Sequence, residues 1–312
     1  MGDENALFRP FARASTTPDS TGCARRKNVA FTVREPEGSA TPLVVEVPHA
    51  GLTVDAAALS TLLAPANALG RDADLYVDEL FQDAPSQGAA LLVAHVSRYV
   101  VDLNRADVDF DALAVEGGSA RVSPHGLVWR TTTEGRSALA GPLSRVELER
   151  RLDVYYRPYH AALRRLLEAR VASFGYAVLL CAHSMPSRGR DGHQDMGRER
   201  ADVVPGSRGR TSAAGSVIDV VDRAAREAGF SIAHDQPYRG GFSTGHYGRP
   251  DHGVHAVQVE LSRRLYMNEL TLERKAREFE QLRGFCRDLV GRLAQVRPRA
   301  ALGPQASSEL GS

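Results

Sequence analysis

The chain has 312 residues, a length that fits one large domain or one domain with lobes. Its 39 Lys and Arg residues nearly balance its 38 Asp and Glu residues, which argues against the strong positive field that nucleic-acid binders use. No stretch approaches the ~18 consecutive apolar residues of a membrane span, and Cys23, Cys181 and Cys286 form no CxxC pair. We therefore expect a soluble, cytoplasmic protein without a disulfide framework, a thiolate metal site, or a nucleic-acid or membrane partner. The sequence specifies no oligomeric state.

In chain order, the first 27 residues mix Pro, Ser, Thr, Gly and Arg without periodicity, and we expect this extension to be disordered. The tail 298–312 has a similar composition, so a single domain is expected over 28–297. Short apolar runs with the length and composition of buried strands occur at 43–47, 90–96, 176–183 and 256–261. Helical periodicity occurs at 143–174, 217–229 and 270–296.

Strands that alternate with long helices indicate an α/β fold, here a three-layer sandwich around a mostly parallel, mixed sheet. The helix expected over 143–174 begins with Ser144 and Glu147 at the spacing of a capping box. The segment 184–216 is rich in Gly, Ser and Arg and directly follows an expected strand. Because long irregular segments in compact domains are often functional, we expect this loop to lie over the active site.

Two histidines stand where apolar runs end. His49 follows LVVEV, and His183 ends YAVLLCAH. Open α/β sheets bind ligands at the carboxyl ends of their strands, and neutral imidazole is a common zinc ligand. A catalytic zinc site takes a third protein ligand, and the acidic candidates here are Asp72, Asp74, Asp78 and Glu79. The alternatives are hydrogen-bonded structural histidines and acidic residues that stabilise a helix start.

Three further polar residues follow apolar runs. Glu260 ends AVQVE, and a carboxylate that a buried strand holds near a metal suits a general base. Asn104 and Arg105 end YVVDLNR, and such a pair can fix a carboxylate and a neighbouring carbonyl group. The alternative for Arg105 is a structural ion pair with Asp102.

Together these segments resemble the N-formylglutamate amidohydrolase family. The similarity rests on blocks that occur in family order: VEVPHAG (45–51), RDADLYVDELF (71–81), VSRYVVDLNR (96–105), YYRPYHAAL (155–163), LLCAHSMPS (179–187) and RGGFSTGHYGRPDHGVHAVQVELSRRLYMNE (239–269). The resemblance implies a zinc-exopeptidase-like (phosphorylase/hydrolase-like) α/β fold. It also implies zinc-dependent hydrolysis of a small acidic N-acyl amino acid, N-formyl-L-glutamate, to L-glutamate and formate, the last step of one histidine-degradation route.

Site residues follow from the same resemblance. It makes His49, Asp74 and His183 the Zn²⁺ ligands and Glu260 the catalytic base. A more distant similarity to aspartoacylase and zinc carboxypeptidases assigns the substrate carboxylate to Asn104 and Arg105. His246 and Tyr247 are available as substrate-binding donors to a developing oxyanion.

The sequence departs from the family pattern at one position. Family members tend to read GGY-x-TRHYG, whereas this chain reads GGFSTGHYG, with Gly245 where Arg is expected. Arg188, Arg190, Arg208 or Arg210 from the loop can substitute for that side chain. The departure motivates a first alternative, hydrolysis of a different N-acyl amino acid or small peptide-like amide. A second alternative is a non-catalytic metal- or ligand-binding protein on the same fold.

Overall fold

The computed structural model describes residues 30–190, 193 and 195–298. The segments expected to be disordered, 1–27 and nearly all of 298–312, lie outside these residues. Within the described ranges, no helix has the length and apolar character needed to cross a membrane.

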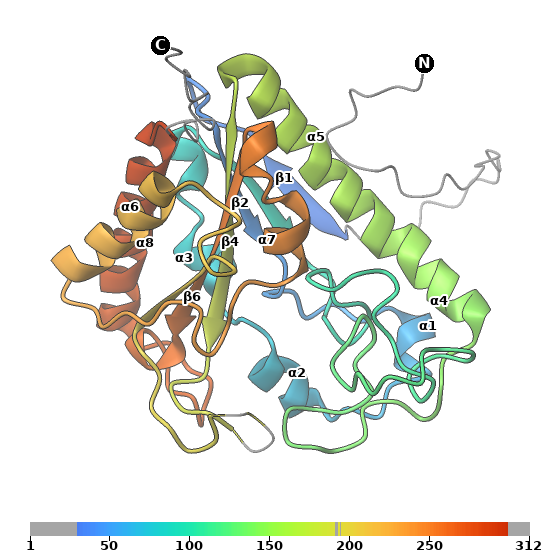
Figure 1. The fold of residues 1–312 in the computed structure, drawn as a ribbon. Coiled ribbons are helices and arrows are strands. Elements are labelled where there is room, and N and C mark those ends of the chain that lie inside the picture. The colour runs from blue at the N-terminus through green and yellow to red at the C-terminus, as the bar shows by residue number, and fades with distance from the viewer. Residues whose placement is uncertain (1–29, 191–192, 194, 299–312) are drawn as a thin grey trace, which may run out of the picture.

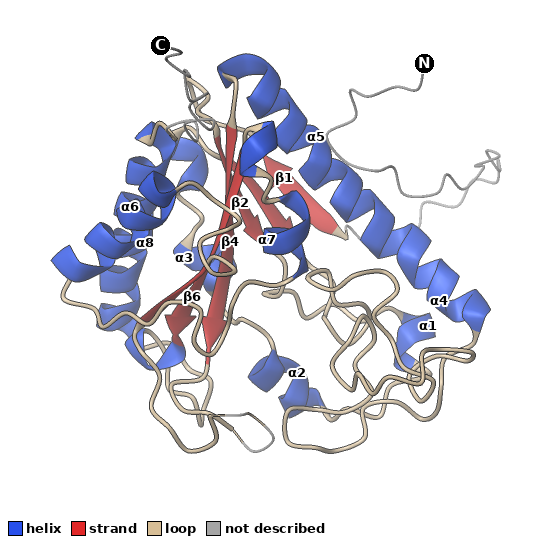
Figure 2. Cartoon of the chain, in the orientation of Figure 1, coloured by secondary structure: helices blue, strands red, loops and turns tan. Residues whose placement is uncertain are grey.

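A mixed sheet forms the centre of the fold (Figure 2). It has six strands in the order β1-β3-β2-β4-β6-β5. The strands are β1 (Phe31–Arg34), β2 (Leu43–Val47), β3 (Ala90–Ala94), β4 (Ala177–Met185), β5 (Val203–Gly206) and β6 (Val254–Ser262). The four inner strands are parallel, and both edge strands run antiparallel to their neighbours. The four apolar runs of the sequence therefore predicted the buried inner strands, and the expected mixed α/β fold is confirmed.

Helices cover both faces of this sheet (Figure 1). The helices of the described chain are α1 (Ala56–Leu59), α2 (Ala66–Asp72), α3 (Val77–Leu80), α4 (Arg145–Arg151), α5 (Arg157–Phe174), α6 (Gly215–Glu227), α7 (Phe242–Tyr247) and α8 (Ala276–Gln295), with short turns η1 (Ala84–Gln87), η2 (Leu152–Tyr156), η3 (Pro250–His252) and η4 (Arg263–Leu265). One buried apolar cluster joins α3, α6 and α8 to one face. A second cluster joins α4, α5 and α7 to the other, which gives three layers.

The helix expected over 143–174 runs without a break from Arg145 to Phe174. It consists of α4, the π-helical turn η2 and α5. Ser144 caps α4 as expected, since its Oγ accepts a hydrogen bond from the backbone N–H of Glu147 at 3.2 Å. The Glu147 carboxylate binds the guanidinium groups of Arg150 and Arg151 instead of returning to Ser144, so only half of the capping box forms.

The sequence did not predict β1, β5 or α7. The segment 184–216 is not a continuous loop, because β5 and the start of α6 lie within it. Strand β5 is short and contains Pro205, which is tolerated because β5 is an edge strand. Helix α8 begins at Ala276 rather than near 270, and Leu272 before it has a left-handed φ of 63°.

The sheet topology brings four chain segments to one place. Because β3, β2, β4 and β6 are parallel, their carboxyl ends meet at the same edge of the sheet. His49 follows β2, and the loop with Asn104 follows β3. His183 and Glu260 each lie two residues before the end of their strands, β4 and β6. Helix α2 lies below this edge in Figure 1 and leads into Asp74.

Candidate active site

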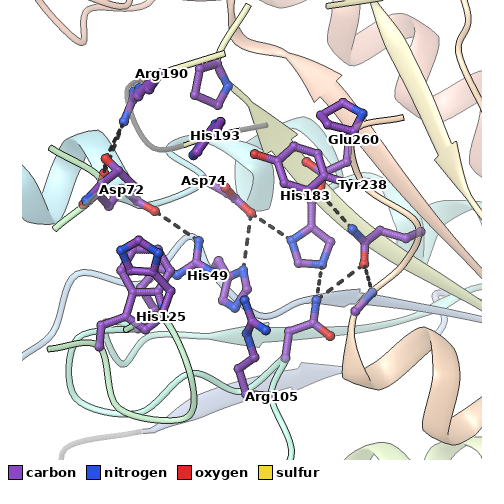
Figure 3. A pocket seen from close by; sticks show the side chains of 18 of the residues that line it. His49, Asp72, Asp74, Arg105, His125, His183, Arg190, His193, Tyr238 and Glu260 are labelled. Atoms are coloured by element: carbon purple, nitrogen blue, oxygen red, sulfur yellow. Dashed lines mark hydrogen bonds and ion pairs between the residues drawn. The ribbon is translucent and has the colours of Figure 1, made fainter. Parts of the chain in front are cut away.

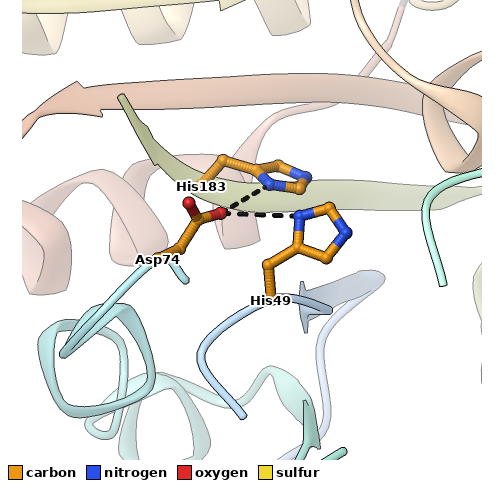
Figure 4. A group of neighbouring side chains, drawn as sticks. All are labelled: His49, Asp74 and His183. Atoms are coloured by element: carbon orange, nitrogen blue, oxygen red, sulfur yellow. Dashed lines mark hydrogen bonds and ion pairs between the residues drawn. The ribbon is translucent and has the colours of Figure 1, made fainter. Parts of the chain in front are cut away.

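Two histidines and an aspartate meet at the carboxyl edge of the sheet (Figure 4). Asp74 Oδ2 lies 2.9 Å from Nδ1 of His183 and 3.6 Å from Nδ1 of His49. The backbone N–H of Asp74 donates to the carbonyl of His49 at 2.9 Å, which ties the loop after α2 to the end of β2. All three residues are buried, and one ligand atom from each lies within 4.8 Å of the others.

Charge interactions keep Asp74 ionised between the two histidines. Burial opposes ionisation of Asp74, but hydrogen bonds and charge interactions with His183 and His49 hold its pKa well below its usual range. Burial also opposes protonation of His183, yet the hydrogen bond to Asp74 and the nearby Glu260 raise its pKa. Two imidazole nitrogens and an ionised carboxylate oxygen form a donor set that zinc accepts, and their number matches that of a catalytic site. The group can therefore hold a metal ion.

Asp102 orients the ring of His49 from the side away from Asp74. Its Nε2 lies 2.7 Å from Oδ1 of Asp102, which is fully buried. The other oxygen, Oδ2, accepts hydrogen bonds from Arg98 at 2.8 Å and from the indole N–H of Trp129 at 3.0 Å. Burial opposes ionisation of Asp102, but His49 and Arg98 hold its pKa well below its usual range. A carboxylate in this position fixes the ring and the tautomer of a metal-binding histidine.

Asp74 is held from its other side by Arg263. The guanidinium donates to Oδ1 of Asp74 at 3.2 Å and to the carbonyls of Arg71 and Ala73 at 2.6 and 2.7 Å. Two acidic neighbours of Asp74 are engaged elsewhere. Asp72 accepts hydrogen bonds from Tyr99, Thr133 and Arg190, and Glu79 pairs with Arg274. Of the four acidic candidates from the sequence, Asp74 is the one that the structure brings to both histidines.

Glu260 lies beside His183 because β4 and β6 are paired, with these two residues opposite each other. Its side chain is buried, and Oε1 accepts a hydrogen bond from Nε2 of Gln258 at 2.8 Å. Burial raises the pKa of Glu260, and the charge of His183 opposes this shift. A carboxylate whose pKa is raised toward the working pH suits proton transfer.

These residues line a cavity of about 320 Å³ (Figure 3). Asn104 and Arg105 line it as well, the first buried and the second 43% exposed, with its guanidinium 3.5 Å from Asp109. Arg190 is the loop arginine that reaches the cavity. The expectation that the loop after β4 lies over the site thus holds for Pro186, Arg190 and His193.

The structure does not bring His246 and Tyr247 to this cavity. Both lie in α7, and Tyr247 is buried with its hydroxyl 2.9 Å from Nδ1 of His160. The ring of His246 stacks on Phe242 at 4.7 Å between centroids. Neither side chain is among those that line the cavity, which removes the geometric basis for their expected contact with substrate.

Gly245 also lies outside the cavity, in a neighbouring recess beside Arg208. A Cβ atom at position 245 would stand 3.0 Å from Cζ of Arg208, so the guanidinium occupies the space that a side chain there would need. Arg188 and Arg210 pair with Glu199 and Asp219 on the surface. Gly245 itself contributes nothing to the lining of the cavity.

The structure adds residues that sequence reasoning missed. His125 and Trp129 line the cavity from the irregular segment after β3. This segment has no helical or strand-like hydrophobic periodicity that would have singled them out. Tyr238 lines it from the loop before α7. The sequence could have pointed to Gln258, because this residue lies two positions before the candidate Glu260 in an expected strand and therefore faces the same side.

The chain is similar to known proteins over most of its length. The sequence profile of the family described as N-formylglutamate amidohydrolase matches residues 41–267. An N-formylglutamate deformylase from Pseudomonas putida is 35% identical over 231 residues, which cover 73% of this chain and 82% of that protein. Its counterpart from Pseudomonas aeruginosa is 35% identical over 233 residues, with 73% and 83% covered.

A crystal structure of N-formylglutamate amidohydrolase from Ralstonia eutropha JMP134 superposes with a TM-score of 0.77 at 32% identity, covering 85% of this chain and 97% of that one. A gene product from Agrobacterium tumefaciens shares the fold, with a TM-score of 0.57 at 21% identity over 86% of this chain and 95% of that one. The profile match spans most of the described residues, and the relatives are covered over most of their length. The chain belongs to the N-formylglutamate amidohydrolase family.

Proposed function

We propose that this chain is a zinc-dependent amidohydrolase that hydrolyses N-formyl-L-glutamate to L-glutamate and formate, with one domain over 28–297 carrying the activity. The observation that carries the proposal is the convergence of the His49, Asp74 and His183 group with Glu260 in one cavity. The names of the two Pseudomonas relatives support the substrate.

His49, Asp74 and His183 would hold the zinc ion, and Asp102 and Arg263 would keep these ligands in place. When bound, zinc is a Lewis acid that polarises a carbonyl group and makes water more acidic. A site at the carboxyl edge of a mixed sheet also fits the zinc-exopeptidase-like architecture implied by the sequence resemblance.

Glu260 is the proposed general base. As water adds to the formyl carbon, the carboxylate accepts a proton from the water. Glu260 then returns that proton to the leaving amine nitrogen as the carbon–nitrogen bond breaks, which yields formate and the free amino acid. Burial beside His183 keeps the carboxylate in a dry site where its basicity is increased.

The cavity suits an acidic substrate. Six arginines line it, against the three carboxylates of Asp72, Asp74 and Glu260. Four of these arginines are paired with carboxylates, namely Arg71, Arg98, Arg190 and Arg263. Arg105 makes only the long contact with Asp109, and Arg239 has no carboxylate partner among the described residues. Arg105, together with Asn104, is the proposed holder of the α-carboxylate.

The test is formate release by the purified protein from N-formylglutamate, compared with release of the acyl group from N-acetyl and N-succinyl amino acids. We expect the highest kcat/KM for N-formylglutamate. A preference for another acyl group would keep the reaction class and support the first alternative. Bound metal without turnover of any N-acyl amino acid would contradict the proposal and support a binding protein.

A further inference from the structure

Two buried amide side chains lie between the proposed base and the proposed substrate-binding residues. Gln258 is in β6, two residues before Glu260 and on the same face of the sheet. Asn104 belongs to the loop after β3. Both are more than nine-tenths buried, and both line the cavity.

Backbone donors fix which way each amide points. The N–H of Gly241 donates to Oε1 of Gln258 at 2.8 Å, so the Gln258 NH₂ group faces Oε1 of Glu260, also at 2.8 Å. The N–H of Ser243 donates to Oδ1 of Asn104 at 2.9 Å, so the Asn104 NH₂ group faces Oε1 of Gln258 at 3.4 Å. A backbone N–H can only donate, which removes the usual ambiguity between amide oxygen and nitrogen.

The turn that holds Gln258 is itself packed on Asn104. A Cβ atom at Gly241 would lie 2.3 Å from Nδ2 of Asn104, so only glycine allows this approach. The backbone N–H of Phe242 donates to the carbonyl of Asn104 at 3.2 Å. The start of α7, the loop after β3 and the end of β6 are thus joined through one connected set of hydrogen bonds.

We propose that Gln258 is a positioning residue, which fixes the carboxylate of Glu260 and couples it to Asn104 and the turn at Gly241. The inference rests on the proposed function, since it assumes that Glu260 is the base. Among the described residues, the hydrogen bond from Gln258 is the one that orients this carboxylate. Without it, the Glu260 side chain would be free to rotate away from the attacking water.

A purely structural role explains the observations less well. Ala256, two residues before Gln258 in β6 and on the same face of the sheet, is fully buried, which shows that an apolar side chain suits this face. A buried amide is unfavourable unless all its polar groups are paired, and here its partners are the proposed base, the backbone N–H of Gly241 and Asn104. The placement therefore serves the site and not the packing of the sheet.

The experiment is a double-mutant cycle with Gln258→Leu, Glu260→Gln and the combined variant, assayed for formate release from N-formylglutamate. We expect Gln258→Leu to lower kcat about tenfold to a hundredfold, with a smaller change in KM, because a mispositioned base loses part of the ~10²–10⁴-fold that general base catalysis supplies. In the Glu260→Gln background, the same substitution should change kcat less than about twofold, since the base is already absent. Equal losses in both backgrounds would overturn the proposal.

His255→Leu is the matched control, because it also removes a buried polar side chain from β6. His255 lies on the opposite face, and its Nδ1 accepts a hydrogen bond from the backbone N–H of Ala214 at 3.1 Å, away from the cavity. It should lower the thermal midpoint without changing kcat. An equal loss of kcat in His255→Leu would assign the effect of Gln258→Leu to general destabilisation and overturn the inference.

A crystal structure of Gln258→Leu gives a readout that does not depend on turnover. We expect the Glu260 carboxylate to adopt a different rotamer or to become disordered. The wild-type Glu260 conformation in that variant would overturn the positioning role. A wild-type protein that releases no formate would instead refute the proposed function, so the two failures are distinguishable.

Discussion

Asp102 provides a sharp test of whether the histidine and aspartate group is a metal site. All the groups around its carboxylate are donors. Oδ1 accepts from Nε2 of His49 at 2.7 Å and from the backbone N–H of Asn104 at 2.9 Å, and Oδ2 accepts from Arg98 and Trp129. In Asp102→Asn, the side-chain NH₂ group must therefore face other hydrogen-bond donors, whichever way the amide is turned.

Two effects of Asp102→Asn follow. An unmade hydrogen bond at a fully buried position lowers the free energy of unfolding by about 1–3 kcal/mol. Loss of the carboxylate that orients a metal-binding histidine lowers metal affinity about 10- to 100-fold, which corresponds to roughly 1.4–2.7 kcal/mol of binding free energy. The first effect follows from burial alone, whereas the second requires His49 to be a ligand.

The assay is competition for zinc with a chelator of known affinity, and Asp111→Asn is the matched control. Asp111 is also buried and also surrounded by donors, which are the backbone N–H groups of Ala114 and Ser123 and the guanidinium of Arg130. Both variants should lose similar stability, but only Asp102→Asn should lose zinc affinity. Equal zinc affinities in the two variants would refute the assignment of His49 as a ligand.

Three further predictions concern the base, the substrate and the core. Glu260→Gln should keep its metal and lose about 10²–10⁴-fold in kcat, whereas full activity would rule out this base. Arg105→Gln should raise KM for N-formylglutamate at least about tenfold through loss of a charge-assisted hydrogen bond, and an unchanged KM would contradict that contact. Burial lowers the pKa of His160 to about 3. Between pH 6.5 and 3 the unfolded chain therefore binds a proton that the folded protein does not, and stability falls as the pH falls. Urea unfolding at pH 7 and pH 5 should show this loss to be about 2 kcal/mol smaller in His160→Gln, and equal losses would contradict it.

The inner strands of the sheet could be predicted because strands that are buried on both faces consist mostly of apolar residues. Strands β2 and β4 are buried on both faces, so each appears as a mostly apolar run, which in β2 contains the buried Glu46. Strand β1 alternates between partly buried and exposed residues over four positions, and β5 contains Pro205. Such short edge strands form because the backbone N–H and C=O groups of a neighbouring strand are available for pairing. The residues of the edge strand itself do not show that such a neighbour is present.

The candidate site was predictable where strand ends define it. His49, His183 and Glu260 follow from the rule that parallel strands present their carboxyl ends at one edge. Asp74 and Asp72 are indistinguishable by local pattern, and contacts with residues as distant in sequence as Arg263 separate them. The family resemblance pointed to His246 and Tyr247, but it gives no information on the direction in which the side chains of α7 point.

The most direct test of the account is metal analysis of the purified protein, paired with formate release from N-formylglutamate before chelation, after chelation and after zinc is restored. We expect about one zinc per chain, loss of formate release with the chelator and recovery with zinc. Full formate release from metal-free protein would contradict the central claim that His49, Asp74 and His183 hold a catalytic metal.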